Sequence, residues 1–227
     1  MQPEMYTQQP SAVSQFETSK VLRNTYALLA MTLMFSAITA GISMAVGVGH
    51  GLSLVFSIAA IVLVWFVLPR TANSAAGIGV VFAFTGLLGA SLGPLLSYYL
   101  GMANGGTIVT QALGGTALVF FALSAYVLTT RKDFSFMGGF LFIGLIVALV
   151  AMVGMMIAGF FGVNIELFHV ALSAVIVLLM SGFILYDTSR IIHGGETNYL
   201  FATTALYLDI YNLFVSLLHL IGFASDE

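Results

Sequence analysis

Charged side chains are scarce in this chain of 227 residues, because 6 Lys and Arg and 9 Asp and Glu make up only 7% of it. A soluble domain usually carries about 25% charged residues, so this chain has too few to cover a surface in water. Cysteine is absent, which excludes disulfides, thiol catalysis and thiolate metal sites. The net charge of -3 is small and dispersed, which argues against nucleic acid as a partner.

Hydrophobic residues make up 60% of the chain, with 24 Gly and 19 Phe among its residues. This composition is typical of a protein whose solvent is the lipid bilayer. The first twenty residues are polar and contain two glutamates. They lack the basic start and short apolar run of a secretory signal. We therefore expect a flexible cytoplasmic tail over residues 1–20, followed by an uncleaved first span.

The basic residues divide the sequence into long uncharged intervals. They fall in four places, at Lys20 with Arg23, at Arg70, at Arg131 with Lys132, and at Arg190. The first two intervals hold 46 and 60 residues without Asp, Glu, Lys or Arg. A membrane-crossing helix needs about 20 apolar residues, so each interval fits two helices and a turn. All four places then lie on one face, which the positive-inside rule predicts to be cytoplasmic.

The intervals predict an all-α, polytopic protein with seven transmembrane helices. The expected helices are 22–47, 53–69, 76–100, 107–129, 136–160, 165–189 and 199–222. They form a transmembrane domain over residues 21–224, with a short C-terminal tail at 225–227. With the basic places in the cytoplasm, seven crossings put the N-terminus inside and the C-terminus outside, and the expected location is the cell's inner (plasma) membrane.

The third expected helix contains a small-residue motif and a proline. Gly89-Ala90-Ser91-Leu92-Gly93 has the G-x-x-x-G spacing that allows two membrane helices to approach closely. Pro94 follows at once and is expected to kink or loosen the helix.

Two aspartates lie in the last two expected spans. Asp209 is about ten residues into the seventh, which at 1.5 Å per residue is roughly mid-membrane, and Asp187 is nearer the cytoplasmic end of the sixth. Ionisable groups inside a membrane are costly and usually functional. We expect the two carboxylates to meet, share a proton and form a latch whose state depends on pH. Water between them would make an oxygen-lined place for Ca²⁺. The alternative is that Asp187 is interfacial and solvated.

Glu166 and His169 are three residues apart at the start of the sixth span. This spacing puts both on one helical face, where they could bind a metal. The simpler interpretation is that Asn164 caps the helix and Glu166 interacts with its dipole, so no firm metal site is predicted.

The loop between the last two spans contains His193-Gly194-Gly195-Glu196. Glycine closing a helix C-terminus is its ordinary explanation. A partner contact or a proton-sensing role through His193 and Glu196 stays open as an alternative.

An intramembrane aspartyl protease is one rival, since such enzymes also place Tyr-Asp on one helix and an aspartate on the next. Tyr186-Asp187 fits the first half of that pattern. The second half expects Gly-x-Gly-Asp, whereas this chain has Leu206-Tyr207-Leu208-Asp209. We therefore expect a protein that is not an enzyme. A carrier-type transporter is a further alternative.

Four long stretches carry a resemblance to a known family. They are KVLRNTYALLAMTLMFSAITA, FAFTGLLGASLGPLLSYYL, ALGGTALVFFALSAYVLTTRKDFSFMGG and IIHGGETNYLFATTALYLDIYNLFVSLLHLIGFAS. The chain resembles the Bax inhibitor-1 (transmembrane Bax inhibitor motif) family, and in particular its bacterial branch typified by YccA, a modulator of the membrane protease FtsH.

The resemblance implies seven helices with the last one central and the other six around it. It implies that Asp187 and Asp209 form a pH-sensing pair controlling a calcium leak, with Arg70 as a weakly matched basic partner. It also implies direct binding to FtsH as a poor substrate that occupies the protease. From its polar composition, we expect the segment Met1–Ser19 to serve in the first engagement of the protease. The expected function is therefore modulation of FtsH, with a pH-gated calcium leak as the alternative. No cofactor is expected, apart from Ca²⁺ as a permeant ion.

Overall fold

Seven helical spans, each long and apolar enough to cross a membrane, make up the computed structural model, which describes residues 12–225, with side chains from Thr18 onward. The elements are α1 (Ala12–Ala45), α2 (His50–Val62), η1 (Leu63–Val67), α3 (Leu68–Thr71), α4 (Ala76–Ser91), α5 (Gly93–Leu100), α6 (Gly105–Thr130), η2 (Ser135–Met137), α7 (Gly138–Phe160), α8 (Glu166–Ile192) and α9 (Tyr199–Ser225). The predicted number and order of spans are confirmed.

Two spans are composite. In the second, the π-helical turn η1 ends at Val67, two residues before Pro69, which has no backbone N–H to donate to the helix. In the third, the helix breaks at Leu92, between α4 and α5. This break lies two residues before Pro94, the proline that we expected to kink or loosen the helix.

The first helix starts earlier than predicted. Residues 12–20, which we expected in a tail, form the beginning of α1. The rest of the predicted tail, residues 1–11, and residues 226–227 lie outside the described part of the chain.

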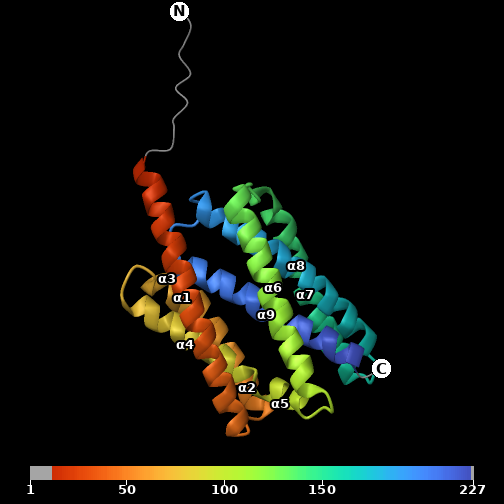
Figure 1. The fold of residues 1–227 in the computed structure, drawn as a ribbon. Coiled ribbons are helices and arrows are strands. Elements are labelled where there is room, and N and C mark those ends of the chain that lie inside the picture. Colours follow the sequence, from red (N-terminus) through yellow and green to blue (C-terminus); the bar gives the residue numbers. More distant parts are fainter. Residues whose placement is uncertain (1–11, 226–227) are drawn as a thin grey trace, which may run out of the picture.

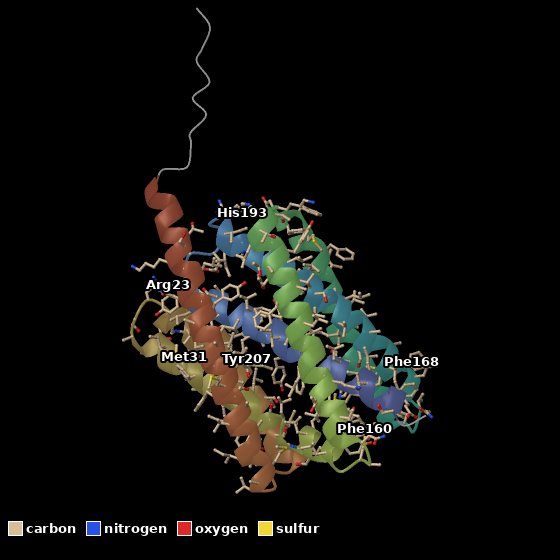
Figure 2. The ribbon with its side chains drawn as sticks, in the orientation of Figure 1. Arg23, Met31, Phe160, Phe168, His193 and Tyr207 are labelled. Carbon is tan, nitrogen blue, oxygen red and sulfur yellow. The ribbon has the colours of Figure 1, made fainter. Side chains whose placement is uncertain are left out.

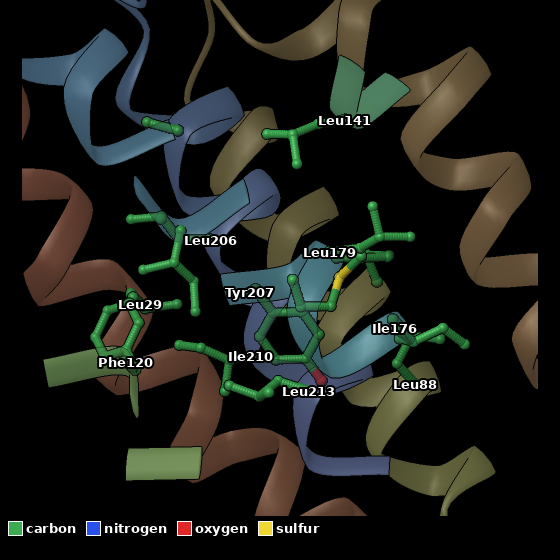
Figure 3. Packing of buried hydrophobic residues seen from close by; sticks show 14 of the residues in the cluster. Leu29, Leu88, Phe120, Leu141, Ile176, Leu179, Leu206, Tyr207, Ile210 and Leu213 are labelled. Atoms are coloured by element: carbon green, nitrogen blue, oxygen red, sulfur yellow. The ribbon is translucent and has the colours of Figure 1, made fainter. Parts of the chain in front are cut away.

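Helix α9 is central, as the family resemblance implies (Figure 1). It contacts α1, α4, α6 and α8, whereas α7 packs on α8 and α2 packs mainly on α4. The buried cluster around α9 includes Leu206, Tyr207, Ile210 and Leu213 (Figure 3). The first and last described residues lie at opposite ends of the bundle (Figure 1).

Helix α1 packs closely on α4 and on the start of α5 through the predicted small-residue motif. A Cβ atom at Gly89 would collide with the Ser36 carbonyl of α1, and one at Gly93 would collide with Ser43. The Ser43 hydroxyl also donates a 2.6 Å hydrogen bond to the Ala90 carbonyl. Glycine is therefore required here because the backbones leave no room for a side chain.

Large apolar side chains cover the outside of the bundle. Phe160 is 85% exposed, Trp65 74% and Phe140 73%. Such a surface would be unstable in water and is suited to lipid. The chain is therefore a multi-pass membrane protein.

Candidate functional site

The two predicted aspartates come together between α8 and α9. Asp187 and Asp209 are close enough for each carboxyl group to act on the other. Asp209 is only 5% exposed. Its Oδ2 atom is buried and has no hydrogen-bond partner among the described residues. Two ionised carboxylates can only accept hydrogen bonds, so a bond between them requires one added proton.

A line of polar side chains leads from this pair to the protein surface. The Asp187 carboxylate is 3.9 Å from the Arg190 guanidinium, whose other nitrogen is 3.7 Å from Glu196. The exposed fraction of the side chains rises from 12% at Asp187 to 34% at Arg190. Arg190 also donates to the Gly195 carbonyl at 3.1 Å and lies over the Tyr186 ring. Arg190 and Glu196 therefore form a charged cluster between Asp187 and the protein surface.

The basic side chain next to Asp187 is Arg190. Arg70, the basic partner implied by the resemblance, lies in α3 and donates to the carbonyl of Phe66, one turn earlier in the chain. Both ion pairs found within the described residues belong to Arg190. Arg190 follows Asp187 by three positions, which puts both on one helical face, so the spacing alone could have identified it.

The predicted loop residues make contacts inside the protein. Gly194 has a φ of 77° and closes α8, while the Gly195 and Glu196 amides both donate to the Arg190 carbonyl. The His193 Nε2 atom is 3.1 Å from the Arg131 carbonyl, and its Nδ1 atom is 2.9 Å from that of Ser189. The His193 ring therefore joins the end of α8 to the end of α6.

Asp133 completes this connection. It accepts hydrogen bonds from the Ser135 amide at 2.8 Å and the Ser189 hydroxyl at 3.3 Å. The bonds from Ser135, helped by nearby His193 and by Ser189, lower the pKa of Asp133 below its ordinary value of 3.8. The loop between α6 and α7 is thus attached to α8 by an acceptor that remains ionised at neutral pH.

Glu166 and His169 lie at the opposite end of the bundle. They line a cavity of about 280 Å³ together with Tyr98, Tyr99 and His219 of α9. The His169 and His219 rings are 5.5 Å apart between centroids. The Glu166 amide donates to Asn164 Oδ1 at 3.0 Å, in agreement with the predicted capping role of Asn164.

No group of three or more His, Asp or Glu side chains within the described residues is arranged to hold a metal ion. Sequence reasoning did not find His219, because no spacing relates it to the start of α8. The pairing of the two histidines follows only from the antiparallel packing of α8 and α9.

Comparison with known proteins gives consistent results. A family model described as "Inhibitor of apoptosis-promoting Bax1" matches residues 18–226. The chain is 52% identical over 214 residues to a protein of Escherichia coli K12 named "Modulator of FtsH protease YccA", covering 94% of each chain. It is 49% identical over 227 residues to an uncharacterized membrane protein of Vibrio cholerae, covering 100% of both.

The match also extends to proteins without an assigned role, such as PA2604 of Pseudomonas aeruginosa, 47% identical over the whole of both chains. A relative in another E. coli strain, 52% identical, is named "Inner membrane protein YccA". The family model covers all seven spans, and these relatives cover nearly the whole length. The chain therefore belongs to the Bax inhibitor-1 family, as its sequence predicted.

Proposed function

We propose that this protein binds and modulates an FtsH-type membrane protease in the inner membrane. The observation that carries the proposal is the 52% identity, over 94% of both chains, to the E. coli protein named as a modulator of that protease. We expect identity at this level over this length to extend to the surfaces through which the two proteins would contact a protease.

We further propose that the N-terminus is cytoplasmic. Lys20 and Arg23 near the start of α1, Arg131 at the end of α6 and Arg190 in the last turn of α8 occupy the same end of the bundle, where Figure 2 labels Arg23 and His193. An excess of Lys and Arg marks the cytoplasmic side.

Co-purification tests the binding directly. Tagged protease, solubilised from membranes in mild detergent, should retain this protein, and an unrelated seven-span membrane protein expressed at the same level should not be retained. Equal recovery of both proteins would contradict specific binding.

The N-terminal segment is the part we propose for the first engagement of the protease. Deleting residues 2–17 leaves the span Thr18–Ala45 whole, and we expect the shortened protein to be degraded more slowly. A variant in which an unrelated polar segment of equal length replaces these residues separates the effect of length from that of sequence. Turnover of the deletion variant at the normal rate would remove this role.

A second candidate function is a cation leak controlled by the aspartate pair, favoured by the approach of Asp187 to Asp209. With one proton shared, the carboxyl groups join α8 to α9, and with none they repel each other. Together they offer at most four oxygens, whereas Ca²⁺ takes roughly six to eight. We therefore propose Ca²⁺ as a passing ion that keeps part of its water.

The leak is tested in liposomes. Calcium flux through the reconstituted protein should change across a pH series, and the Asp209→Asn variant should lose most of that dependence. Asp133→Asn, a change at an exposed loop carboxylate, is the matched control and should keep it. A flux that ignores both pH and Asp209→Asn would exclude the gate and leave protease modulation untouched.

A catalytic role is not proposed. In place of the two glycines expected before the second aspartate of an intramembrane protease, the chain carries Leu206, which is buried in the core, and Leu208.

A further inference from the structure

An apolar groove runs along the bundle between α1 and α6. Its volume is about 430 Å³. Its floor is the face of α9 that carries Tyr207, Ile210 and Phe214, and Figure 1 shows α9 behind the two helices and between them. Helices α1 and α6 are not packed on each other along their length. The groove therefore opens sideways, toward the lipid.

The groove is closed at one end and open toward the other. The Tyr26 hydroxyl of α1 donates to Ser124 of α6 at 2.9 Å, and the Tyr26 ring lies 6.0 Å from that of Phe120. This bridge is at the end of the bundle that carries Arg23. From there the lining continues to Met44 on α1 and Val109 on α6, close to the turns at the opposite end.

The polar groups that line the groove already have partners inside the protein. Ser36 and Tyr207 bond to each other at 2.6 Å, and Thr116 donates to the Ala112 carbonyl at 2.7 Å. Tyr211 bonds to Ser91 at 3.1 Å. No Asp, Glu, Lys, Arg or His is among the lining residues. A polar ligand would lose its hydrogen bonds with water and gain few in the groove, so the occupant must be apolar.

The dimensions of the groove suit a hydrocarbon chain that lies along the bundle. The lining runs from Val109 to Phe121 on α6 and from Tyr26 to Met44 on α1, about 18 Å and about 27 Å at 1.5 Å per residue. A polypeptide helix with its side chains is about 10–12 Å across, whereas an acyl chain is thinner and apolar along its whole length, so it requires the smaller displacement of the two walls.

The length agrees with the same occupant. The hydrocarbon core is about 30 Å thick, so the chains of one leaflet extend over about 15 Å. We propose that the groove between α1 and α6 is a binding site for one acyl chain of a membrane phospholipid. The chain enters from the leaflet at the α1–α2 and α5–α6 turns, which is the periplasmic leaflet in the orientation proposed above. The site depends on neither the protease nor the aspartate pair.

Filling the groove from either wall tests the proposal. Ala117 of α6 and Ala37 of α1 both line the groove and are exposed, so Ala117→Phe and Ala37→Phe place a ring in it without displacing the core. Ala122, on α6 but outside the groove, is also exposed. Ala122→Phe is therefore the matched control.

The measurement is native mass spectrometry of the full chain released from nanodiscs made of one synthetic phosphatidylcholine. We expect one retained phospholipid per chain in the unmodified protein and in Ala122→Phe. Its retention should fall roughly tenfold in Ala117→Phe and Ala37→Phe, because each lost methylene contact weakens binding. Equal retention in Ala117→Phe and Ala122→Phe would overturn the proposal, as would a second copy of the chain or another polypeptide bound in place of lipid.

A second measurement uses only the unmodified protein. Phosphatidylcholine with a photoreactive group in the middle of its acyl chain should label peptides of α1, α6 and α9 at groove residues several times more strongly than the exposed face of α7. Uniform labelling over all lipid-facing helices would mean that the groove holds only bulk lipid, and would refute a binding site.

Discussion

Helix α1 lies close to one neighbour and stands apart from another, although it offers small side chains to both. Toward α4 and the start of α5, a Cβ atom added at Gly89 or Gly93 would collide with Ser36 or Ser43 of α1. Toward α6, Ala37 and Gly41 line an open groove. Small residues therefore permit close packing but do not cause it, and contacts elsewhere in the bundle decide which side closes.

Beyond the bond between Tyr26 and Ser124, contacts of α6 with other helices set its distance from α1. Ser124 of α6 is 3.3 Å from Thr188 of α8, and the amide of Phe134, just beyond α6, donates to Ser189 at 2.9 Å. Between α1 and α6, the buried ring of Phe214 from α9 helps to keep the walls apart. The close packing of α1 on α4 and the open groove between α1 and α6 thus depend on different contacts. Substitutions can therefore alter one without the other.

The largest effect is expected on the closed side. Gly89→Leu forces a side chain against the Ser36 backbone, and we expect a loss of about 3 kcal/mol in the free energy of unfolding, with poor yield. Gly79, on the same helix, is exposed, and a Cβ atom added there would have nothing within 4 Å, so Gly79→Leu should cost under about 0.5 kcal/mol. Thermal unfolding in detergent measures both, and equal stability would mean that the contact between α1 and α4 is not close.

A smaller effect is expected at Tyr207, which links the floor of the groove on α9 to α1 and α4. The Tyr207 hydroxyl bonds to Ser36 at 2.6 Å and donates to the Thr85 carbonyl at 3.2 Å. Tyr207→Phe removes both bonds and should cost about 1–2 kcal/mol. Tyr98 is 62% exposed, so Tyr98→Phe serves as the control. Denaturant titration of the two variants should separate them, and identical midpoints would argue against the attachment.

The closed end of the groove should respond more weakly. Tyr26→Phe removes the bond to Ser124, at a cost of about 1 kcal/mol, because the ring still packs on Phe120. We expect spin labels on α1 and α6 near that end to show a broader distance distribution than in the unmodified protein. An unchanged distribution would mean that packing alone closes this end.

The smallest effect is expected at the loop that attaches α6 to α8. The pKa of Asp133 is lowered in the folded protein, chiefly by the Ser135 hydrogen bonds. Its contribution to stability is therefore present above pH 3.8, the ordinary value, and is lost as the pH falls through the lower folded value. Asp133→Asn should be slightly less stable at neutral pH, and the difference in melting temperature should shrink in strong acid. A difference that grows with acidity would contradict this sign.

Much of the fold could be predicted because charge is costly in lipid. The positions of Arg23, Arg70, Arg131 and Arg190 divide the chain at the membrane surface, and the spans observed between them agree with those predicted. The start of α1 at Ala12 could not be predicted, since its polar residues carry no membrane signal and the helix extends beyond the apolar run.

The candidate site was only partly predictable. Depth along a helix can be counted, so Asp187 and Asp209 stood out as ionisable groups inside spans. Spacing along α8 would also have indicated Arg190. Spacing along one helix could not predict that His169 meets His219, because His169 lies near the start of α8 and His219 near the end of α9.

The amino-acid sequence by itself determined how many times the chain crosses the membrane, where it turns, and which ionisable groups lie within the spans. These follow from local composition, since each stretch of chain meets lipid or water independently. Only the tertiary structure decided that Asp209 faces Asp187, that α1 closes on α4, and that it stays apart from α6. Lipid is as apolar as the side chains it surrounds, so the sideways arrangement of helices depends on the fit of many side chains at once.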